Sequence, residues 1–241
     1  MMKEVMINNI QDLQKIGNDP NYPLDGEYVL TQDIDASDTV NWNNGSGFVP
    51  IGTESNPFIG KFNGNGYKIH RLHINRFSQS YIGLFGCIGK NSEVLNLGIE
   101  EGWVIGGDNA GILVGSNGGI VRNCYSTGNV SGKNSVGGLI GTNRGTVLRS
   151  YSTCSVTGDR YVGGFVGWNG FDAIVGQSYS MGGVLGCNAV GGLVGYNKGI
   201  VSHCYSICST SGYDRIGRLI GFNYEGTVSQ SYGTGSVRKN K

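Results

Sequence analysis

The chain has 241 residues, a formal net charge of +1 and only 15% charged residues. This low charge excludes the basic surface by which proteins bind nucleic acids or anionic membranes, so we expect no nucleic-acid partner. No run approaches the roughly 18 apolar residues of a transmembrane helix, so we expect no membrane span. Glycine is unusually frequent, at 44 residues, against an average of about 7%. This abundance indicates a chain that turns often and packs its backbone closely.

The first element that we predict is a short amphipathic helix within residues 8–17. Three apolar residues recur there at helical spacing, an asparagine can cap the start, and Gly17 can end the helix. The apolar residues are Ile10, Leu13 and Ile16, and the N-cap is Asn8 or Asn9. At the start of a stack of strands, such a helix covers the open apolar end.

The next segments predict strands and turns. Residues 26–37 alternate well enough for a first strand, and 41–57 is a loop rich in Asn, Gly and Pro. Residues 63–66 predict a turn, followed by a strand that reaches residue 74. The residues of that strand expected to point inward are Ile69, Leu72 and Ile74.

From residue 81 onwards, a unit of 26–29 residues recurs about six times. The core of the unit is Gly-Gly-apolar-apolar-Gly, in which Ile112 and Arg218 replace the second glycine in two units and the unit at Ile82 to Gly86 diverges. The closing glycines are Gly86, Gly115, Gly141, Gly167, Gly195 and Gly221. Two residues later stands an asparagine, at Asn117, Asn143, Asn169, Asn197 and Asn223. A tyrosine preceded by Cys or Ser follows, at Tyr125, Tyr151, Tyr179, Tyr205 and Tyr232. Such self-similarity is typical of a repeat architecture.

The period predicts an all-β fold, a parallel β-helix with three short strands in each unit. Equivalent residues then stack into ladders, so each asparagine amide can bond to the next. We expect one β-solenoid domain over 1–241. Its parts are a cap and N-terminal coils over 1–80, about six repeats over 81–237, and a tail over 238–241.

The repeat resembles the GLUG motif, in which a core such as Gly191 to Gly195 is followed by N-x-G-x-V and a Cys/Ser-Tyr-Ser step. Five units from Gly111 to Val237 match, and Ile82 to Gly86 opens a divergent sixth. The resemblance implies a right-handed β-helix and a bacterial cell-surface or secreted protein, often a large adhesin. Such repeats also occur beside the catalytic domain of IgA-protease-type metallopeptidases. The resemblance carries no catalytic residue to this chain.

Catalytic and metal sites are not indicated by the titratable residues. The only histidines are His70, His73 and His203, so an HExxH zinc site is excluded. His70 and His73 are three apart on a predicted strand and face opposite sides unless a bulge intervenes. The adjacent Glu100 and Glu101 also face opposite sides. The three aspartates that could bind calcium lack the glycine and distal glutamate of an EF-hand and are interpreted as strand-end caps. They are Asp33, Asp35 and Asp38. We therefore expect no catalytic residue, no metal and no cofactor.

Three other sets of residues are interpreted as structural. Aspartates and asparagines before the Gly-Gly core indicate turns; they are Asp108, Asp159, Asp214, Asn134 and Asn188. The cysteines that align in the repeat register lie two or three coils apart, beyond disulfide reach, so free buried thiols are expected. All six are Cys87, Cys124, Cys154, Cys187, Cys204 and Cys208. A threonine row that could bind ice is interrupted after Thr127 and Thr153 and resumes only at Thr234.

The residue directly after each closing glycine is the candidate functional position. It is Trp168, Tyr196 and Phe222 in three successive coils, where the earlier coils have Cys87, Ser116 and Thr142. Coils stack at about 4.8 Å, which is near the repeat of a pyranose chain, and aromatic faces stack on sugars. The hypothesis is that the three aromatic residues bind a glycan strand. The alternative is that the same stripe only covers the last coils or packs in the core.

These observations predict a non-catalytic structural or adhesive module whose partner is a polysaccharide or a cell-surface glycan. The alternative is a polysaccharide-active β-helix enzyme, either a lyase or a glycoside hydrolase. We expect an extracellular or cell-surface location, although residues 1–10 lack the apolar core of a signal peptide. The repeats also lead us to expect that the chain is part of a larger polypeptide.

Overall fold

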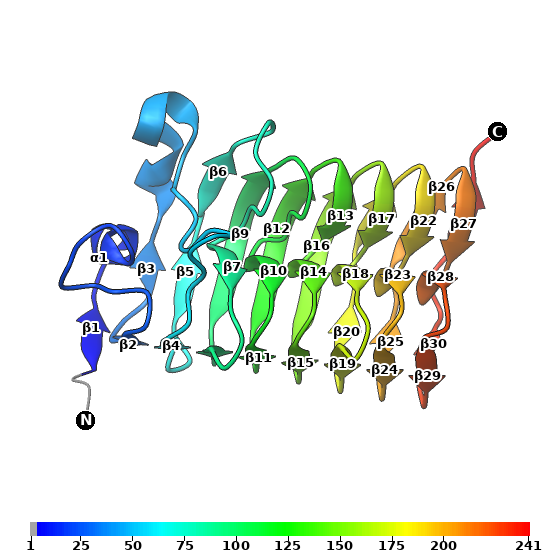
Figure 1. Ribbon diagram of the computed structural model, residues 1–241. Coiled ribbons are helices and arrows are strands. Elements are labelled where there is room, and N and C mark those ends of the chain that lie inside the picture. The colour runs from blue at the N-terminus through cyan, green and yellow to red at the C-terminus, as the bar shows by residue number, and fades with distance from the viewer. Residues whose placement is uncertain (1–3) are drawn as a thin grey trace.

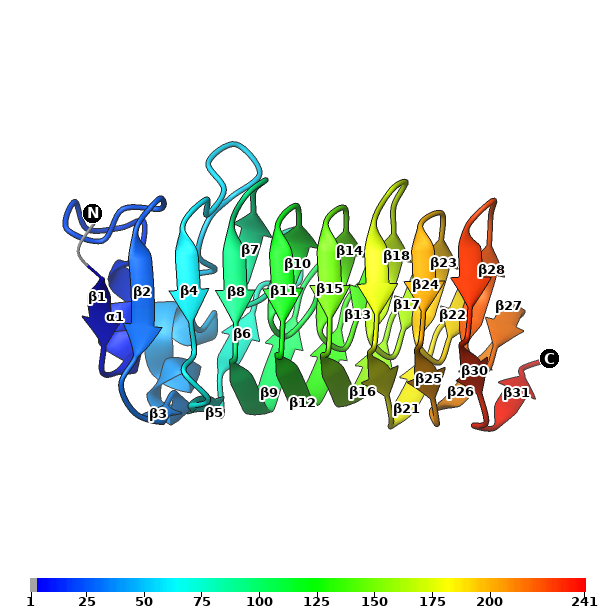
Figure 2. The same cartoon turned by 90° about the horizontal axis from the view of Figure 1, so that it is seen from below.

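The computed structural model describes residues 4–241 as one elongated β-solenoid. The chain winds in coils stacked from one end to the other, with β1 at one end and β31 at the other (Figures 1 and 2). Its longest continuous ladder has nine strands, so there are about nine turns. Two short helices accompany the described strands, α1 (Ile10–Lys15) and the 3-10 helix η1 (Ser37–Gly45). The predicted fold class, an all-β parallel solenoid, is confirmed.

The described strands form four sheets that run along the solenoid. Sheet A contains β1 (Val5–Ile7), β2 (Glu27–Leu30), β4 (Lys61–Asn63), β8 (Glu93–Leu95), β11 (Ile120–Arg122), β15 (Thr146–Leu148), β19 (Ile174–Gly176), β24 (Ile200–Ser202) and β29 (Thr227–Ser229). Sheet C contains β7 (Phe85–Ile88), β10 (Val114–Asn117), β14 (Ile140–Asn143), β18 (Val166–Asn169), β23 (Val194–Asn197) and β28 (Ile220–Asn223). Neighbouring strands within each ladder are parallel and in register, so each coil pairs with the next.

The other two sheets complete each coil. Sheet B contains β3 (Ile34–Asp35), β5 (Lys68–His70), β6 (His73–Asn75), β9 (Gly98–Ile105), β12 (Tyr125–Ser131), β16 (Tyr151–Thr157), β20 (Tyr179–Ser180), β21 (Gly183–Leu185), β25 (Tyr205–Ser206), β26 (Ser209–Gly212), β30 (Tyr232–Gly233) and β31 (Val237–Lys239). Sheet D contains β13 (Asn134–Gly137), β17 (Arg160–Gly163), β22 (Asn188–Gly191) and β27 (Asp214–Gly217). Because sheet D lies beside sheet C, the central coils have four strands.

The prediction of three strands in each repeat is wrong because the Gly-Gly core bends. In the repeat at 134–143, β13 ends at Gly137 and β14 begins only at Ile140. A side chain at Gly137 would overlap the Ile140 carbonyl oxygen, and one at Gly138 would overlap the Ser152 hydroxyl. The two glycines therefore allow a tight corner between sheets D and C that a larger residue would block.

The N-terminal coils differ from the prediction in their strands. β1 precedes the helix and pairs in parallel with β2, so the strand expected to be first is the second. The helix itself is confirmed: Asn9 caps it by accepting a hydrogen bond of 2.8 Å from the Asp12 amide. All three of its predicted apolar residues are buried, and the predicted loop begins inside η1.

The strand predicted before residue 74 is interrupted at Arg71. This residue has a φ of 58°, so β5 and β6 are separate strands. Ile69, Leu72 and Ile74 are buried as predicted. The left-handed residue shifts the alternation by one position, so His70 and His73 both lie half-buried at the outer side of sheet B. The two histidines were expected on opposite sides unless a bulge intervenes, and the irregularity at Arg71 brings them to the same side.

The core is one continuous column of apolar side chains between the sheets. In sheet A it is an aliphatic ladder of Val94, Val121, Val147, Val175 and Val201, all fully buried. Five cysteines are buried free thiols, as expected, whereas Cys187 is exposed because it stands in the corner before β22. Burial raises the pKa of the Cys87 thiol to about 11, so this group remains uncharged.

Candidate functional site

The predicted aromatic stripe forms on sheet C. Trp168, Tyr196 and Phe222 occupy equivalent positions of β18, β23 and β28, and parallel pairing places each beside the next. All three are half-buried, and Thr142 occupies the same position on β14. The structure thus brings together all three candidate residues on one outward face.

The stripe lies along the corner between sheets C and D. A closing glycine precedes each stripe residue, and a side chain there would meet the backbone of this corner. At Gly221, for example, an added Cβ atom would lie 2.5 Å from the Ala189 carbonyl carbon. In the earlier coils the stripe position holds a small buried residue, and Thr142 donates a hydrogen bond of 2.6 Å to Asn109 in the corner. The larger rings of the last three coils extend this face into solvent.

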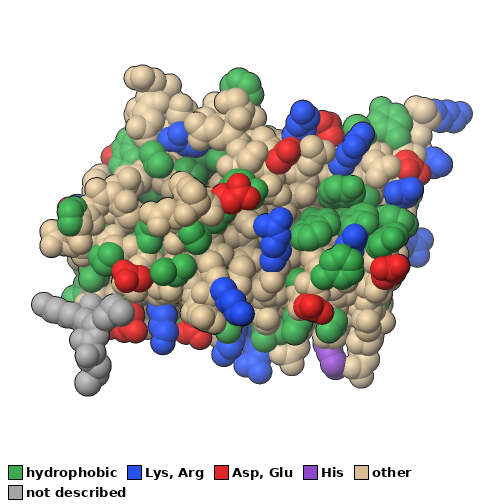
Figure 3. Space-filling view, in the orientation of Figure 1, with side chains coloured by type: hydrophobic (Ala, Val, Ile, Leu, Met, Phe, Trp, Pro, Cys, Tyr) green, Lys and Arg blue, Asp and Glu red, His purple; other side chains and the backbone are tan. Residues whose placement is uncertain are grey.

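Three further aromatic residues join the stripe, and sequence reasoning missed them. The Tyr161 ring centroid lies 4.8 Å from that of Tyr196, and the Tyr224 centroid lies 6.4 Å from it. Phe171, in the loop after β18, is 61% exposed. We use the name aromatic patch for Trp168, Tyr196, Phe222, Tyr161, Phe171 and Tyr224. In the space-filling view, green side chains gather over the last coils of this face (Figure 3).

A signal for the missed residues is present in the sequence. Tyr161 stands at the corner position of the repeat, where other coils have Asn109 or Ser135. Its φ is 57°. Phe171 stands two residues after the ladder residue Asn169, and Tyr224 stands one residue after Asn223. Aligned by coil, Tyr161 and Phe171 fall in the coil of Trp168 and Tyr224 falls in the coil of Phe222, whereas the coil of Tyr196 has no aromatic residue at these positions.

Cationic side chains lie over the rings of the aromatic patch. The Arg144 guanidinium is 5.7 Å from the centre of the Trp168 ring, and that of Arg215 is 4.2 Å from the Phe222 ring. The Lys198 ammonium is within 4.7 Å of the Tyr224 and Phe171 ring centres, and 5.9 Å from that of Tyr196. Such contacts contribute about 0.5–1 kcal/mol each at exposed sites. The patch therefore combines aromatic rings with positive groups that lie over their faces.

The asparagine and tyrosine ladders form as predicted. Each asparagine amide donates to the next carbonyl oxygen at 2.7–2.8 Å, from Asn117 to Asn223. The first four tyrosine rings stack at 4.8–4.9 Å with planes 4° apart, from Tyr125 to Tyr205. Both ladders run uninterrupted through several coils, so they stabilise the solenoid itself.

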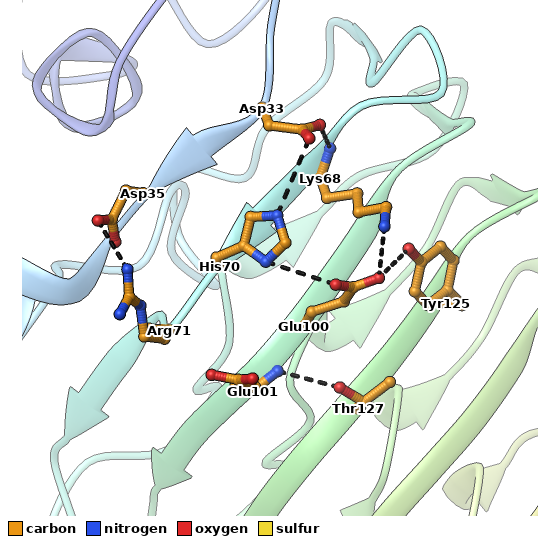
Figure 4. A network of polar contacts seen from close by, with 9 residues as sticks. All are labelled: Asp33, Asp35, Lys68, His70, Arg71, Glu100, Glu101, Tyr125 and Thr127. Carbon is orange, nitrogen blue, oxygen red and sulfur yellow. Dashed lines mark hydrogen bonds and ion pairs between the residues drawn. The ribbon is translucent and has the colours of Figure 1, made fainter.

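A polar network closes the tyrosine ladder at its N-terminal end (Figure 4). The Tyr125 hydroxyl donates to Glu100 Oε1 at 2.7 Å, and Lys68 Nζ lies 3.0 Å from the same oxygen. His70 Nδ1 is 3.4 Å from the other carboxylate oxygen. The hydrogen bond from Tyr125, followed by that from Lys68, lowers the pKa of Glu100. Glu100 is therefore held ionised, whereas a catalytic acid needs a raised pKa.

Glu101 does not face away from Glu100 as predicted, because its φ of 55° breaks the alternation of β9. Glu101 is exposed, Glu100 is half-buried, and both lie on the outer side. The Glu101 amide donates to Thr127 Oγ1 at 3.0 Å, so its backbone bonds to the neighbouring coil. The two carboxylates are thus on one surface, but only Glu100 belongs to the network.

Replacing Glu100 by glutamine is expected to change how stability depends on pH. The pKa of Glu100 is lowered by folding, so its contribution is present above the unfolded value of about 4.5 and is lost as the pH falls through the lower folded value. The stability difference between the wild type and Glu100→Gln should therefore shrink from pH 7 to pH 3 in thermal unfolding. Glu101→Gln is the matched control. Equal pH profiles for Glu100→Gln and the wild type would contradict this assignment.

Two of the three aspartates, Asp33 and Asp35, cap backbone amides as interpreted, and Asp35 also forms an ion pair. Asp35 accepts from the Ser37 amide and pairs with Arg71 at 2.8 Å, and Asp33 accepts from the Lys68 amide at 2.9 Å. The His73 ring stacks on the Trp103 ring, with the two ring centroids 4.4 Å apart. Within residues 4–241, no group of three or more His, Cys, Asp or Glu side chains is arranged to hold a metal ion.

The turn residues before the Gly-Gly core also behave as interpreted, with one change of register. Asn134 donates to Asp108 at 2.9 Å and Asn188 to Asp214 at 2.7 Å. Between them, the paired residue is Arg160 and not Asp159. Hydrogen bonds between coils thus fix this corner.

Comparison with known proteins shows the fold and partial relatives. No protein-family model matches the chain. The chain is 41% identical over 114 residues to halomucin of Haloquadratum walsbyi and 40% identical over 118 residues to a protein of Evansella cellulosilytica provisionally named a Gly-rich membrane protein. These matches cover 46% and 47% of this chain, but only 1% and 14% of those proteins.

A solved structure shares the architecture over almost the whole chain. It belongs to a Bacteroides ovatus protein provisionally assigned as an immunoglobulin A1 protease, and it superimposes with a TM-score of 0.75. The match covers 99% of this chain and 83% of the other, at 19% sequence identity. At this identity the likeness shows the fold alone. No helix in the described part of the chain is long and apolar enough to cross a membrane.

Proposed function

We propose that the chain is a non-catalytic β-solenoid module of a secreted or cell-surface protein and that its aromatic patch binds a glycan. In this proposal the repeats are of the GLUG type and the module has a structural and adhesive role. One domain spans 1–241, with a cap and N-terminal coils over 1–80, repeats over 81–237 and a tail over 238–241. The Haloquadratum and Evansella proteins, one a mucin by name and the other a membrane protein, support a surface location. The small share of those proteins that the chain spans supports a larger parent polypeptide.

The observation that carries the proposal is the register of Trp168, Tyr196 and Phe222. Parallel pairing places one ring on each of three successive coils. The Tyr196 and Phe222 ring centroids are 5.4 Å apart with their planes at 63°, so the rings meet edge to face at a spacing close to the length of one pyranose unit. Aromatic faces at that spacing can meet consecutive sugars of one chain lying along the solenoid axis.

The aromatic patch also has the polar edge that a sugar needs. The Tyr196 hydroxyl is protonated at neutral pH, as the ordinary tyrosine pKa of about 10 requires, and burial raises its pKa further, so it can donate to a sugar oxygen. Arg144 and Lys198 add donors beside the rings. Binding sites of this kind combine apolar faces with a few polar groups that fix orientation.

Removing two rings tests the proposal directly. Trp168→Ala combined with Tyr196→Ala should weaken binding on a glycan array by about tenfold or more, since central aromatic residues dominate such interfaces. Phe77→Ala is the control, because Phe77 is 75% exposed and lies in the N-terminal coils. Unchanged binding by the double variant would exclude the patch as the glycan site. Release of reducing ends from a polysaccharide panel would overturn the non-catalytic part and favour the lyase or hydrolase alternative.

A further inference from the structure

The cations beside the aromatic patch are available for a ligand. Arg144 is exposed, Lys198 is half-buried, and neither forms an ion pair within 4.0 Å of an acidic group in the described part of the chain. Their charged ends rest over aromatic rings instead, which is a weak interaction at an exposed site. Two cations without acidic partners therefore stand on the surface proposed to bind sugar.

Stacking of a sugar on these rings competes with the cations for the same faces. A neutral sugar that displaced the Lys198 ammonium from Tyr196, and the Arg144 guanidinium from Trp168, would offer these cations only neutral hydroxyl acceptors in exchange. A sugar with an acidic group offers these cations a charge-assisted hydrogen bond, which is stronger than the contact that it replaces. Both side chains are long and flexible, so their charged ends can reach such a group while the ring is covered.

We infer that the glycan bound by the aromatic patch is an anionic polysaccharide, with carboxylate or sulfate groups that pair with Arg144 and Lys198. This inference rests on the proposed function and adds the chemical class of the ligand. Arginine suits both groups, because its planar fork binds carboxylate and other oxyanions bidentately. In this arrangement the polysaccharide lies along the solenoid axis. Its acidic groups point toward the loops that follow β14 and β23.

Acidic side chains near the patch reduce the positive charge that each cation offers to the ligand. Glu54 and Arg144 both act on the pKa of Cys87, so Glu54 offsets part of the charge of Arg144 at longer range. Asp214 Oδ2 lies 3.6 Å from Arg215 Nε, so the charge of Arg215 is partly compensated. Glu225 lies near Tyr196, where it contributes to the raised pKa of that phenol. The anionic groups of the polysaccharide are therefore expected nearer β18 and β23 than the end of β28. Arg215 contributes less to binding than Arg144 and Lys198 do.

The test compares pairs of polysaccharides that share a backbone and differ in charge. Binding is measured by calorimetry with polygalacturonate and its methyl-esterified form, and with dextran sulfate and dextran. The wild type is compared with Arg144→Gln and Lys198→Gln, which keep the rings. Lys133→Gln is the matched control, an exposed lysine in the corner between β12 and β13. Circular dichroism confirms that each variant is folded.

The expected result is binding of an anionic chain about tenfold tighter than its neutral counterpart. Each charge-removing substitution should weaken that binding by about tenfold, the loss typical of one hydrogen bond to a charged group, and salt should weaken it further. The control should leave it unchanged. Preference for polygalacturonate assigns carboxylates as the recognised groups, and preference for dextran sulfate assigns sulfates.

Two outcomes overturn the inference, and they can be told apart. If the neutral chains bind as tightly as the charged ones and both cation variants bind normally, the ligand class is wrong while glycan binding stands. If none of the four chains binds to the wild type, the proposed glycan site fails together with the inference.

Discussion

Asn169→Ala is expected to lower the free energy of unfolding by about 3–5 kcal/mol. Asn169 is fully buried, accepts a hydrogen bond from Asn143 at 2.8 Å and donates one to Asn197 at 2.8 Å. The substitution leaves a buried donor on one side and a buried acceptor on the other, each costing about 1–3 kcal/mol. The measurement is urea unfolding followed by far-ultraviolet circular dichroism.

Two further variants separate the hydrogen bonds from other effects of the change. Asn169→Asp keeps the shape but loses the donor and introduces a buried charge, so it should destabilise the fold at pH 7 at least as much. Asn129→Ala is the control because Asn129 is exposed on β12, and its effect should stay within about 0.5 kcal/mol. An Asn169→Ala variant no less stable than Asn129→Ala would show that the ladder does not stabilise the solenoid.

The ladders could be predicted because repetition converts sequence spacing into spatial contact. Once the period indicates parallel coils, Asn143 must lie beside Asn117 and Asn169, whatever the path of the chain between them. The same reasoning placed Tyr151 on Tyr125 and Trp168 beside Tyr196. Register is therefore the part of this structure that depends least on local geometry.

Local geometry explains what could not be predicted. Left-handed residues such as Arg71 and Glu101 reverse the inside-outside alternation, and neither arginine nor glutamate signals this conformation in a sequence. The corner that divides the Gly-Gly core into two strands depends on contacts between coils. The members Phe171 and Tyr224 of the aromatic patch were missed because each of their repeat positions is aromatic in one coil alone, so no ladder marks them in the sequence.

Glycine at the close of each core is explained by the crossing of two backbones, and this predicts the second large effect. An added side-chain carbon at Gly141 would lie 2.5 Å from the carbonyl carbon of Asn109 and 2.6 Å from the amide nitrogen of Ala110. Both atoms belong to the backbone of a neighbouring coil and cannot rotate aside. Gly141→Ala should therefore separate sheet C from the corner before it and destabilise the protein by about 3 kcal/mol or more.

Gly183→Ala provides the matched comparison for Gly141→Ala. A side-chain carbon at Gly183 would meet no atom within 4 Å, and alanine in a strand restricts the unfolded chain more than glycine does. We expect an effect within about 1 kcal/mol, in thermal unfolding of both variants under the same conditions. If the two substitutions lowered stability by the same amount, the closing glycines would act through backbone entropy alone. A large difference would show that close approach between coils, and not chain flexibility, requires the closing glycines.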